Sequence, residues 1–440
     1  MSSSNLAAAR KRAFAAGTIG NIVEWYDFSL YGYFATTIAS QFFPKSDPTA
    51  SALATFAIFG VGLLARPVGG IIFGRLGDRI GRRRTLMASV MLMSAGTVAM
   101  GVLPGYEQIG TAAAALLLLC RLVQGFSTGG EYTGSAIYVI EYAPLARRGW
   151  YAAIAPAASY VGGVLGIVMS LVMAATTTSA QLASWGWRVP FILAAPLALL
   201  GLYLRLKMDE SPEFEAMRAA GQLESKPVMR ALKMTKKRML VLIGWTMAGS
   251  TASYILTGFL VADLISTVKF TSTEALFVGL ITFLVLTVGC LVGGWAIDVI
   301  GRKRVAVGSA IGLGAWAIPA FMLIHSGSLP GVCIAAAIVA ILVGCVGSTT
   351  ALAVVELFPV GVRASASAMA YNFSYAVFGG SAPYIATLLV GVNPAGPGYY
   401  LAGMCAIAAV AAAVGIGNRA QGNPEHDLTQ VPVASSDHTS

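Results

Sequence analysis

The chain has 440 residues, of which 57% are hydrophobic and only 11% are charged. Soluble domains carry roughly 25% charged residues, so this composition excludes an ordinary soluble protein and predicts a membrane protein. The formal net charge is +10. Because the basic residues lie in short segments between apolar runs, this charge indicates membrane topology and not nucleic-acid binding.

Apolar segments of about 20 residues, long enough to cross ~30 Å of hydrocarbon, recur along the chain. We predict an all-α membrane protein in which residues 1–13 form a polar N-terminus and the polar residues 418–440 form a disordered tail. The twelve predicted spans lie at about residues 14–39, 51–74, 85–103, 112–142, 150–175, 187–207, 239–265, 273–297, 304–325, 331–357, 364–391 and 397–417.

The distribution of Lys and Arg predicts the orientation of the spans. Most of the 29 basic residues fall in or beside Arg75–Arg84, Arg205–Arg238, Arg302–Arg304 and the N-terminus, whereas Lys45 and Lys269 lie in connections on the other side. Basic residues are retained on the cytoplasmic side of a membrane. We therefore expect both termini to lie in the cytoplasm.

A polar and basic connection at residues 208–238 divides the spans into two sets of six, at 14–207 and 239–417. Parallel repeats of six spans, with a substrate bound near the midplane between them, are typical of alternating-access transporters. The division predicts two six-helix pseudo-symmetric bundles joined by a cytoplasmic linker.

Short motifs support this repeat and suggest a gate. The segment Gly74–Arg84 reappears in part as Gly294–Arg304, and a Glu-x-x-Pro motif followed by Arg occurs once in each half. An acidic group at a helix end can favour one packing of two bundles over another, although the arginines also serve topology. The gating candidates are Asp78, Arg82, Arg83, Asp298, Arg302, Glu141, Arg148, Glu356 and Arg363.

Two carboxylates lie in the first predicted span. Glu24 and Asp27 share a helical stripe with Gly20 and Tyr31. An ionised group in the bilayer is kept only where a bundle interior, a partner charge or water receives it. We expect Asp27, together with Glu24, to carry the coupled proton. The alternative is a structural ion pair with Arg66 or Arg121.

A second polar stripe lies in the fourth span and contains Arg121, Gln124, Thr128 and Glu131. We expect it to meet the first stripe across a cavity. Arg121 is predicted to bind a substrate carboxylate, to tune the proton site or to neutralise Glu131. Glu131 is a further proton-coupling candidate, although a structural partner would also explain it. Arg66 is expected to be structural, with a side chain that extends outward toward the cytoplasmic end of its span.

Polar and aromatic residues of the spans are candidates for substrate binding. A carboxylate would use Arg121 and hydrogen-bond donors, whereas a betaine would place its ammonium over an aromatic ring beside a carboxylate. Both substrate classes remain open on these residues, and we favour a carboxylate over an osmolyte. The candidates besides Arg121 are Trp25, Tyr26, Tyr31, Tyr132, Tyr254, Tyr371, Asn372 and Tyr375.

Motifs of other functional classes are missing from the sequence. The five cysteines have no metal-ligand spacing, and no P-loop or dinucleotide motif occurs. We therefore expect no catalytic residues, metal or cofactor, and neither an enzyme nor an ATP-driven pump. An uncoupled facilitator, a channel or a receptor on the same scaffold remains an alternative.

The chain resembles the major facilitator superfamily and, within it, the metabolite:H+ symporter family over about residues 17–417. The resemblance rests on Gly20-Asn21, Glu24-Trp25-Tyr26-Asp27-Phe28, Arg66-Pro67, Gly69-Gly70, Gly74 to Arg83, Arg121, Gln124-Gly125, Gly129-Gly130-Glu131, Trp187-Arg188, Pro190-Phe191, Glu210-Ser211-Pro212, Phe214, Glu356-Leu357-Phe358-Pro359 and Arg363.

This resemblance implies a monomer in the bacterial inner membrane that imports citrate, α-ketoglutarate, shikimate, an aromatic acid, proline or glycine betaine with protons. It also implies that helices 1, 4, 7 and 10 line the cavity, that the Asp78 loop latches the cytoplasmic side and that Arg121 is linked to proton transfer. Val299 departs from the family pattern, which has a basic residue after Asp298, so we expect the second latch to be weaker.

Overall fold

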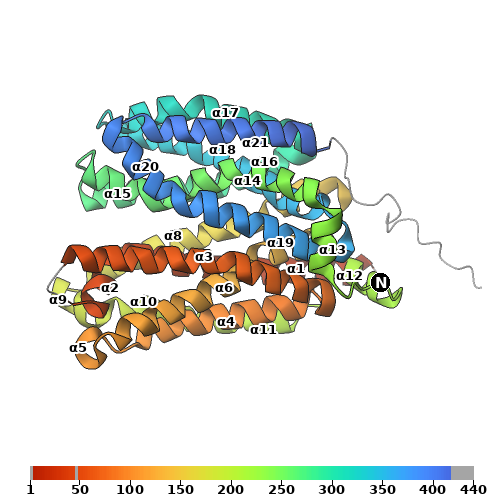
Figure 1. Cartoon of the computed structure of the whole chain (residues 1–440), viewed down its shortest axis with the longest axis horizontal. Coiled ribbons are helices and arrows are strands. Elements are labelled where there is room, and N and C mark those ends of the chain that lie inside the picture. Colours follow the sequence, from red (N-terminus) through yellow and green to blue (C-terminus); the bar gives the residue numbers. More distant parts are fainter. Residues whose placement is uncertain (1–2, 45–47, 418–440) are drawn as a thin grey trace, which may run out of the picture.

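The computed structural model describes residues 3–44 and 48–417. The predicted disordered tail at 418–440 and Lys45 lie outside these described residues. The described part is helical and contains no β-strand. Its helices form two groups that lie side by side along their length (Figure 1).

The N-terminal group contains the first six predicted spans. Several spans are divided into two shorter helices, because a turn or a π-helical segment interrupts them. Its helices are α1 (Ser3–Tyr33), α2 (Ala35–Phe42), α3 (Pro48–Ile80), α4 (Arg82–Val102), α5 (Tyr106–Ile109), α6 (Ala112–Glu141), α7 (Arg148–Ala152), α8 (Ile154–Thr176), α9 (Ser179–Gln181), α10 (Arg188–Ile192) and α11 (Ala194–Leu206).

The C-terminal group contains the other six spans. The connection between the groups carries two short helices, α12 (Pro212–Ala219) and α13 (Pro227–Met234). The C-terminal helices are α14 (Lys236–Tyr254), α15 (Leu260–Ser266), α16 (Ser272–Ile300), α17 (Arg302–Ile324), α18 (Leu329–Glu356), α19 (Arg363–Ser374), α20 (Gly380–Val392) and α21 (Gly396–Gly415).

The lengths and compositions of these helices suit a membrane. Within the described residues, 10 helical segments are long and apolar enough to cross one. The helices α1 and α3 are also long enough to cross a membrane, at 31 and 33 residues, but they carry charged side chains. Together they account for all twelve predicted spans, and the all-α fold with two six-helix bundles is confirmed.

A seam of glycines brings α3 and α6 into close contact. A Cβ atom on Gly125 would overlap the carbonyl of Gly62, and one on Gly69 would overlap the carbonyl of Phe126. Small residues allow membrane helices to approach where no hydrophobic effect drives association. This close approach sets the positions of Arg66 on α3 and Arg121 on α6.

The two groups meet along two helix pairs. The helix α3 packs along α19, and α8 packs along α16. Two π-helical turns, Ile255–Phe259 and Tyr375–Gly379, interrupt the helices that begin with α14 and α19. Turns of this kind are frequently found at functional sites. Tyr254 and Tyr375, which stand at these turns, contact each other at 6.4 Å between ring centroids.

Candidate functional site

Asp27 and Arg121 are direct partners in the interior of the N-terminal half. Arg121 Nη1 lies 3.1 Å from Asp27 Oδ2, and Gln124 Nε2 donates to Asp27 Oδ1 at 2.9 Å. Gln124 also accepts from Arg121 and donates to Thr97 Oγ1, both at 2.9 Å. The Asp27 network, formed by Asp27, Thr97, Arg121 and Gln124, is buried, and both Asp27 oxygens accept hydrogen bonds within one half of the molecule.

Tyrosines on α1 support this network and do not face the other half. The Arg121 guanidinium lies over the ring of Tyr31, 4.1 Å from its centroid. The Tyr31 hydroxyl donates to the carbonyl of Thr55 at 3.0 Å, and that of Tyr26 donates to the carbonyl of Pro190 at 2.8 Å. Both substrate-binding candidates therefore hydrogen-bond within the N-terminal half.

Glu131 lies near the other end of the same stripe and has a different partner. Its carboxylate forms an ion pair with Arg205 of α11 and accepts a hydrogen bond from Ser89 Oγ at 2.5 Å. All three residues are buried. Sequence reasoning missed Arg205, because a basic residue in the last turn of a span is ordinarily explained by topology.

Glu24 and Arg66 form a second buried pair at the boundary between the halves. Arg66 Nη2 lies 3.3 Å from Glu24 Oε1, and neither Glu24 oxygen accepts a hydrogen bond from the described residues. Arg66 Nε reaches Asn372 Oδ1 of α19 at 3.5 Å. The amide nitrogen of Asn372 in turn donates to the carbonyl of Gly129 at 2.7 Å. The Glu24–Arg66 pair thus contacts both halves.

Arg66 has the ion-pair partner that a structural role predicts, but its side chain does not extend toward the cytoplasmic end. Its exposure is only 3%. The helix α3 continues to Ile80, 14 residues further on, which corresponds to ~21 Å of helix. That distance exceeds the reach of a side chain, so Arg66 pairs in the interior instead.

A cluster of four tyrosines lies at the boundary, and three of them, Tyr254, Tyr371 and Tyr375, interact with Arg66. Tyr132 of α6 stacks on Tyr371 of α19 at 4.6 Å between ring centroids, and Tyr371 stacks on Tyr375 at 4.1 Å. Tyr254 contacts Tyr375 and interacts with Arg66. This tyrosine cluster, Tyr132, Tyr254, Tyr371 and Tyr375, is buried and includes residues of both halves.

Trp25 also lies between the halves. Its ring contacts Tyr160 of α8 at 5.4 Å and Phe283 of α16 at 6.4 Å between centroids. The predicted site residues therefore divide into two sets. One set, which includes Glu24, Trp25, Asn372 and the tyrosine cluster, lies at the boundary together with Arg66. The other set consists of Asp27, Arg121, Glu131, Tyr26 and Tyr31 and lies inside the N-terminal half.

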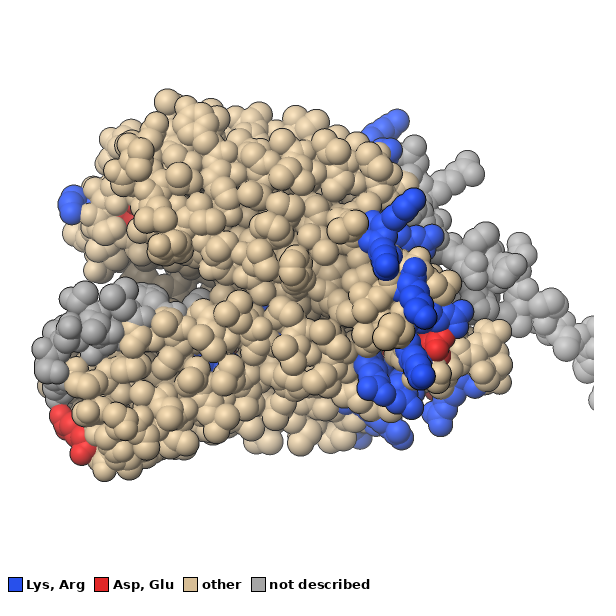
Figure 2. All heavy atoms as spheres, viewed as in Figure 1, with Lys and Arg blue, Asp and Glu red and all other residues tan. Residues whose placement is uncertain are grey.

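The gating candidates gather at one end of the molecule, which we call the basic end because its surface carries most of the visible Lys and Arg (Figure 2). Asp78 accepts hydrogen bonds from the backbone N–H groups of Ala364 and Ser365 at 3.1 and 2.8 Å. These groups begin α19, where the helix dipole favours an anion.

Asp298 makes the pseudo-symmetric contact. It accepts hydrogen bonds from the backbone N–H groups of Gly149 and Trp150 at 2.7 and 2.9 Å. These groups begin α7, as Ala364 and Ser365 begin α19. Val299 does not prevent this second contact, because the aspartate alone makes it.

Ion pairs cross between the halves at the same end. Arg363 Nη1 lies 2.8 Å from Glu141 Oε1, and Arg148 Nη1 lies 3.7 Å from Glu356 Oε1. Each of these glutamates also has a partner in its own half, since Arg82 approaches Glu141 at 3.7 Å and Arg302 pairs with Glu356. The basic-end lock, formed by these pairs and the two aspartates, closes this end of the molecule.

The remaining gating candidate and the linker complete the lock. Arg83 Nη2 donates to the carbonyl of Leu206 at 2.8 Å and does not cross to the other half. Glu213 of α12 contacts both Arg363 and Arg148, at 2.5 and 3.8 Å. Sequence reasoning missed Glu213, because an acidic residue in a polar linker is usually solvated.

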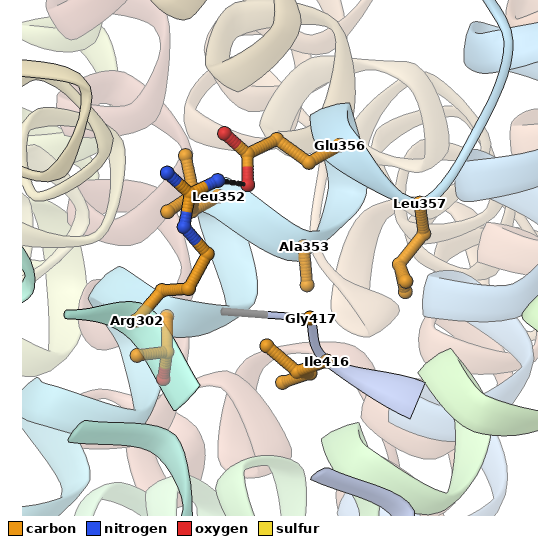
Figure 3. A pocket seen from close by; sticks show the side chains of 8 residues that line it. Arg302, Leu352, Ala353, Glu356, Leu357, Ile416 and Gly417 are labelled. Carbon is orange, nitrogen blue, oxygen red and sulfur yellow. Dashed lines mark hydrogen bonds and ion pairs between the residues drawn. The ribbon is translucent and has the colours of Figure 1, made fainter. Parts of the chain in front are cut away.

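A small pocket lies beside the Arg302–Glu356 pair (Figure 3). It is lined by residues of α17 and α18 and of the chain after α21, among them Leu352, Ala353 and Ile416. None of its lining residues belongs to the set at the boundary between the halves. The pocket is therefore separate from the Glu24–Arg66 pair.

Known proteins share both the sequence and the fold. The family model described as "Sugar (and other) transporter" matches residues 13–240 and 215–416. The proline/betaine transporter of Escherichia coli K12 is 34% identical over 406 residues, covering 89% of this chain and 80% of that protein. The alpha-ketoglutarate permease of the same organism is 35% identical over 389 residues, covering 87% and 88%.

Solved structures match over nearly the whole chain. XylE, a major facilitator superfamily proton:xylose symporter bound to 6-bromo-6-deoxy-D-glucose, has a TM-score of 0.77 at 17% identity and covers 92% of this chain and 95% of that chain. The human organic anion transporter MFSD10 has a TM-score of 0.66 at 16% identity and covers 92% and 99%. The chain therefore belongs to the sugar (and other) transporter family of the major facilitator superfamily, as the resemblance to metabolite:H+ symporters predicts, and it is an integral membrane transporter and not an enzyme.

Proposed function

We propose that this protein is a proton-coupled importer of a small solute that carries a carboxylate, and that zwitterions such as proline and glycine betaine are its best candidate substrates. The observation that carries this proposal is the Glu24–Arg66 pair at the boundary between the halves. A guanidinium binds a carboxylate through paired, charge-assisted hydrogen bonds. Arg66 is buried in the interior and contacts residues of both halves, as a substrate between two bundles requires.

The tyrosine cluster favours a zwitterion over a dicarboxylate. A quaternary ammonium is attracted to aromatic faces, and Tyr254, Tyr371 and Tyr375 are aromatic residues that interact with Arg66. A second carboxylate would need a second cation, but Arg121 is engaged in the Asp27 network. The relatives named as proline/betaine transporters support the same substrate class, and the alpha-ketoglutarate permease supports a carboxylate as the second candidate.

We base the direction of transport on the proposed proton coupling, because an inward proton gradient drives a symported solute into the cell. If the basic end faces the cytoplasm, as the positive-inside rule requires, both termini are cytoplasmic. The basic-end lock then closes the cytoplasmic side, and solute enters from the opposite end. We assign the protein to the bacterial inner membrane as a monomer, with Glu24, Asp27, Glu131 and Arg121 as the groups proposed to couple protons.

The experiment that tests this function is uptake into proteoliposomes with an alkaline interior. We expect labelled proline or glycine betaine to accumulate above the external concentration, and α-ketoglutarate less so. An uncoupled facilitator or channel would only equilibrate a solute without net charge. Uptake that stops at equal concentrations while the pH gradient persists would contradict proton coupling.

Arg66→Lys tests the carboxylate site. Lysine retains the charge but loses the paired donors, so we expect the apparent affinity for proline to fall at least about thirtyfold, which corresponds to ~2 kcal/mol. Arg75→Lys is the matched control, because Arg75 lies on the same helix and is exposed. Equal affinities of the two variants, measured as the concentration for half-maximal uptake, would exclude Arg66 from binding.

A further inference from the structure

We propose that the substrate carboxylate and the proton bind to the two members of one pair. The carboxylate replaces Glu24 at Arg66, and the released Glu24 takes up the proton. This inference rests on the proposed function, and it specifies which carboxylate couples the proton and why the two ligands travel together.

The contacts of Glu24 support this exchange. Its carboxylate is 1% exposed, accepts no hydrogen bond from the described residues and has Arg66 as its ion-pair partner at 3.3 Å. A substrate carboxylate that engages Arg66 would leave Glu24 as an unpaired buried anion. Breaking a buried pair in this way is strongly unfavourable, and protonation removes the charge. Substrate binding therefore requires proton binding.

Other ionisable groups near Glu24 cannot replace Arg66 as its partner. Asp27 lies on the same helix, and Glu131 lies on α6, where Arg205 already neutralises it. Tyr132 and Tyr254 are the nearby phenols, and both are neutral hydrogen-bonding groups. None of these groups supplies a positive charge to Glu24 when Arg66 is engaged by the substrate.

The charges balance in this scheme. Before binding, Arg66 and Glu24 neutralise each other. After binding, Arg66 pairs with the substrate carboxylate and Glu24 is an uncharged acid. A zwitterion then leaves its ammonium as the remaining positive charge, and the tyrosine cluster offers ring faces to receive it. The complex of proton and zwitterion carries one net positive charge.

Asp27 is less suited to the exchange. Both of its oxygens accept hydrogen bonds, from Arg121 and Gln124, and all members of that network belong to the N-terminal half. A substrate between the halves does not compete for these donors. Arg66, in contrast, also contacts Asn372 of the other half. A change of partner at Arg66 therefore affects the Arg66–Asn372 contact, which must break when the halves move apart.

The first test is the pH dependence of equilibrium binding, measured by calorimetry on the full-length protein in detergent with proline and glycine betaine as probes. If the wild type takes up one proton with each substrate, its affinity for the substrate falls about tenfold for each unit of rise in pH, once the pH is high enough to ionise Glu24. We expect Glu24→Gln to bind at least as tightly as the wild type at acidic pH and to lose the pH dependence. A merely structural role of Glu24 would weaken binding instead.

Asp27→Asn is the matched comparison on the same helix, because Asp27 is held by Arg121 and Gln124 and exchanges no partner with the substrate in this scheme. If Asp27→Asn loses the pH dependence and Glu24→Gln retains it, the inference is overturned. Glu24→Asp keeps the carboxylate, so we expect it to show the pH-dependent binding that Glu24→Gln lacks. If both variants fail to bind substrate, the loss is due to misfolding.

The second test uses transport in proteoliposomes. We expect Glu24→Gln to retain exchange of internal unlabelled for external labelled proline, and to lose accumulation driven by a pH gradient. Accumulation by Glu24→Gln at wild-type levels overturns the inference but leaves the proposed function intact. If the wild type transports neither proline, glycine betaine nor α-ketoglutarate, the proposed function itself fails.

Discussion

Each buried carboxylate of the N-terminal half's polar stripes meets an arginine from another helix. Glu24 pairs with Arg66 and Asp27 with Arg121, at 3.3 and 3.1 Å. Glu131 pairs with Arg205. An unpaired charge in this environment is far more costly than a pair, so the pairing itself is expected. What distinguishes the pairs is their surroundings, because the Glu24 pair alone of these three touches a residue of the other half.

Gly20→Ala tests the Glu131–Arg205 pair without removing either charge. A Cβ atom at Gly20 would overlap Glu131 Oε1 and Arg205 Nη2. We expect the substitution to separate the pair and to destabilise the protein by about 3 kcal/mol, the scale of a broken buried ion pair. Thermal unfolding in detergent measures the loss.

Gly32→Ala is the control for this substitution. Gly32 lies on the same helix, is exposed and has open space where a Cβ would stand. Alanine there should be neutral or stabilising by up to ~1 kcal/mol, because it favours the helix. Equal stabilities of the two variants would show that the clash at Gly20 is relieved at no cost.

At the scale of the helices, sequence periodicity predicts the polar stripe of α1 but not the partner of each side chain. Glu24 and Asp27 are three residues apart, so they point about 60° away from each other around the helix. That divergence directs Glu24 toward α3 and Asp27 toward α6. The sequence predicts the twelve spans well, because their signal is local. The sequence offers Arg66 as a partner for the carboxylates of α1, but Arg205 and Glu213 could not be paired in advance, because their partners depend on how distant helices pack.

The glycine seam between α3 and α6 offers a test at this scale. Gly125→Ala would place a methyl group against the carbonyl of Gly62, where backbone and not a flexible side chain must move. We expect the helices to be pushed apart, with destabilisation of ~2 kcal/mol or more, because overpacking forces backbone shifts.

Gly60→Ala is the matched control on α3, since a Cβ atom at that position would have open space around it. The yield of monodisperse protein and the thermal unfolding midpoint of the two variants provide the measurement. A wild-type midpoint for Gly125→Ala would show that the seam tolerates expansion.

At the scale of the whole molecule, the basic-end lock reflects the internal repeat. Asp78 binds the start of α19 in the C-terminal half, and Asp298 binds the start of α7 in the N-terminal half. The cross-pairs are equivalent in the same way: Arg363 of the C-terminal half pairs with Glu141, and Arg148 of the N-terminal half pairs with Glu356. Sequence comparison of the halves predicts these equivalent positions, although it does not predict that Val299 leaves the second contact intact.

Asp298→Asn tests whether the lock controls the conformation. An amide accepts weaker hydrogen bonds than a carboxylate does, and losing charge-assisted bonds of this kind costs about 1.5 to 3 kcal/mol. We expect the population that is open at the basic end to increase by at least about tenfold, since ~1.4 kcal/mol corresponds to that factor. Distances between spin labels at the exposed Arg79 and Arg304 report the opening.

Asp209→Asn is the control, because Asp209 pairs with Arg12 of the N-terminal half on the exposed surface. An unchanged distance distribution in Asp298→Asn, or an equal change in both variants, would contradict a role of the lock in conformation.

The linker helix α12 occurs once, whereas the aspartate contacts and the cross-pairs of the lock each occur twice. Glu213 therefore cannot serve both repeats equally, and it lies nearer to Arg363 than to Arg148, at 2.5 against 3.8 Å. This single acidic side chain contacts an arginine of each half at the basic end, so it adds an attraction that opening of this end would break. In the absence of cargo, the resting transporter would favour the state that is sealed on the linker side, and each turnover would begin from there.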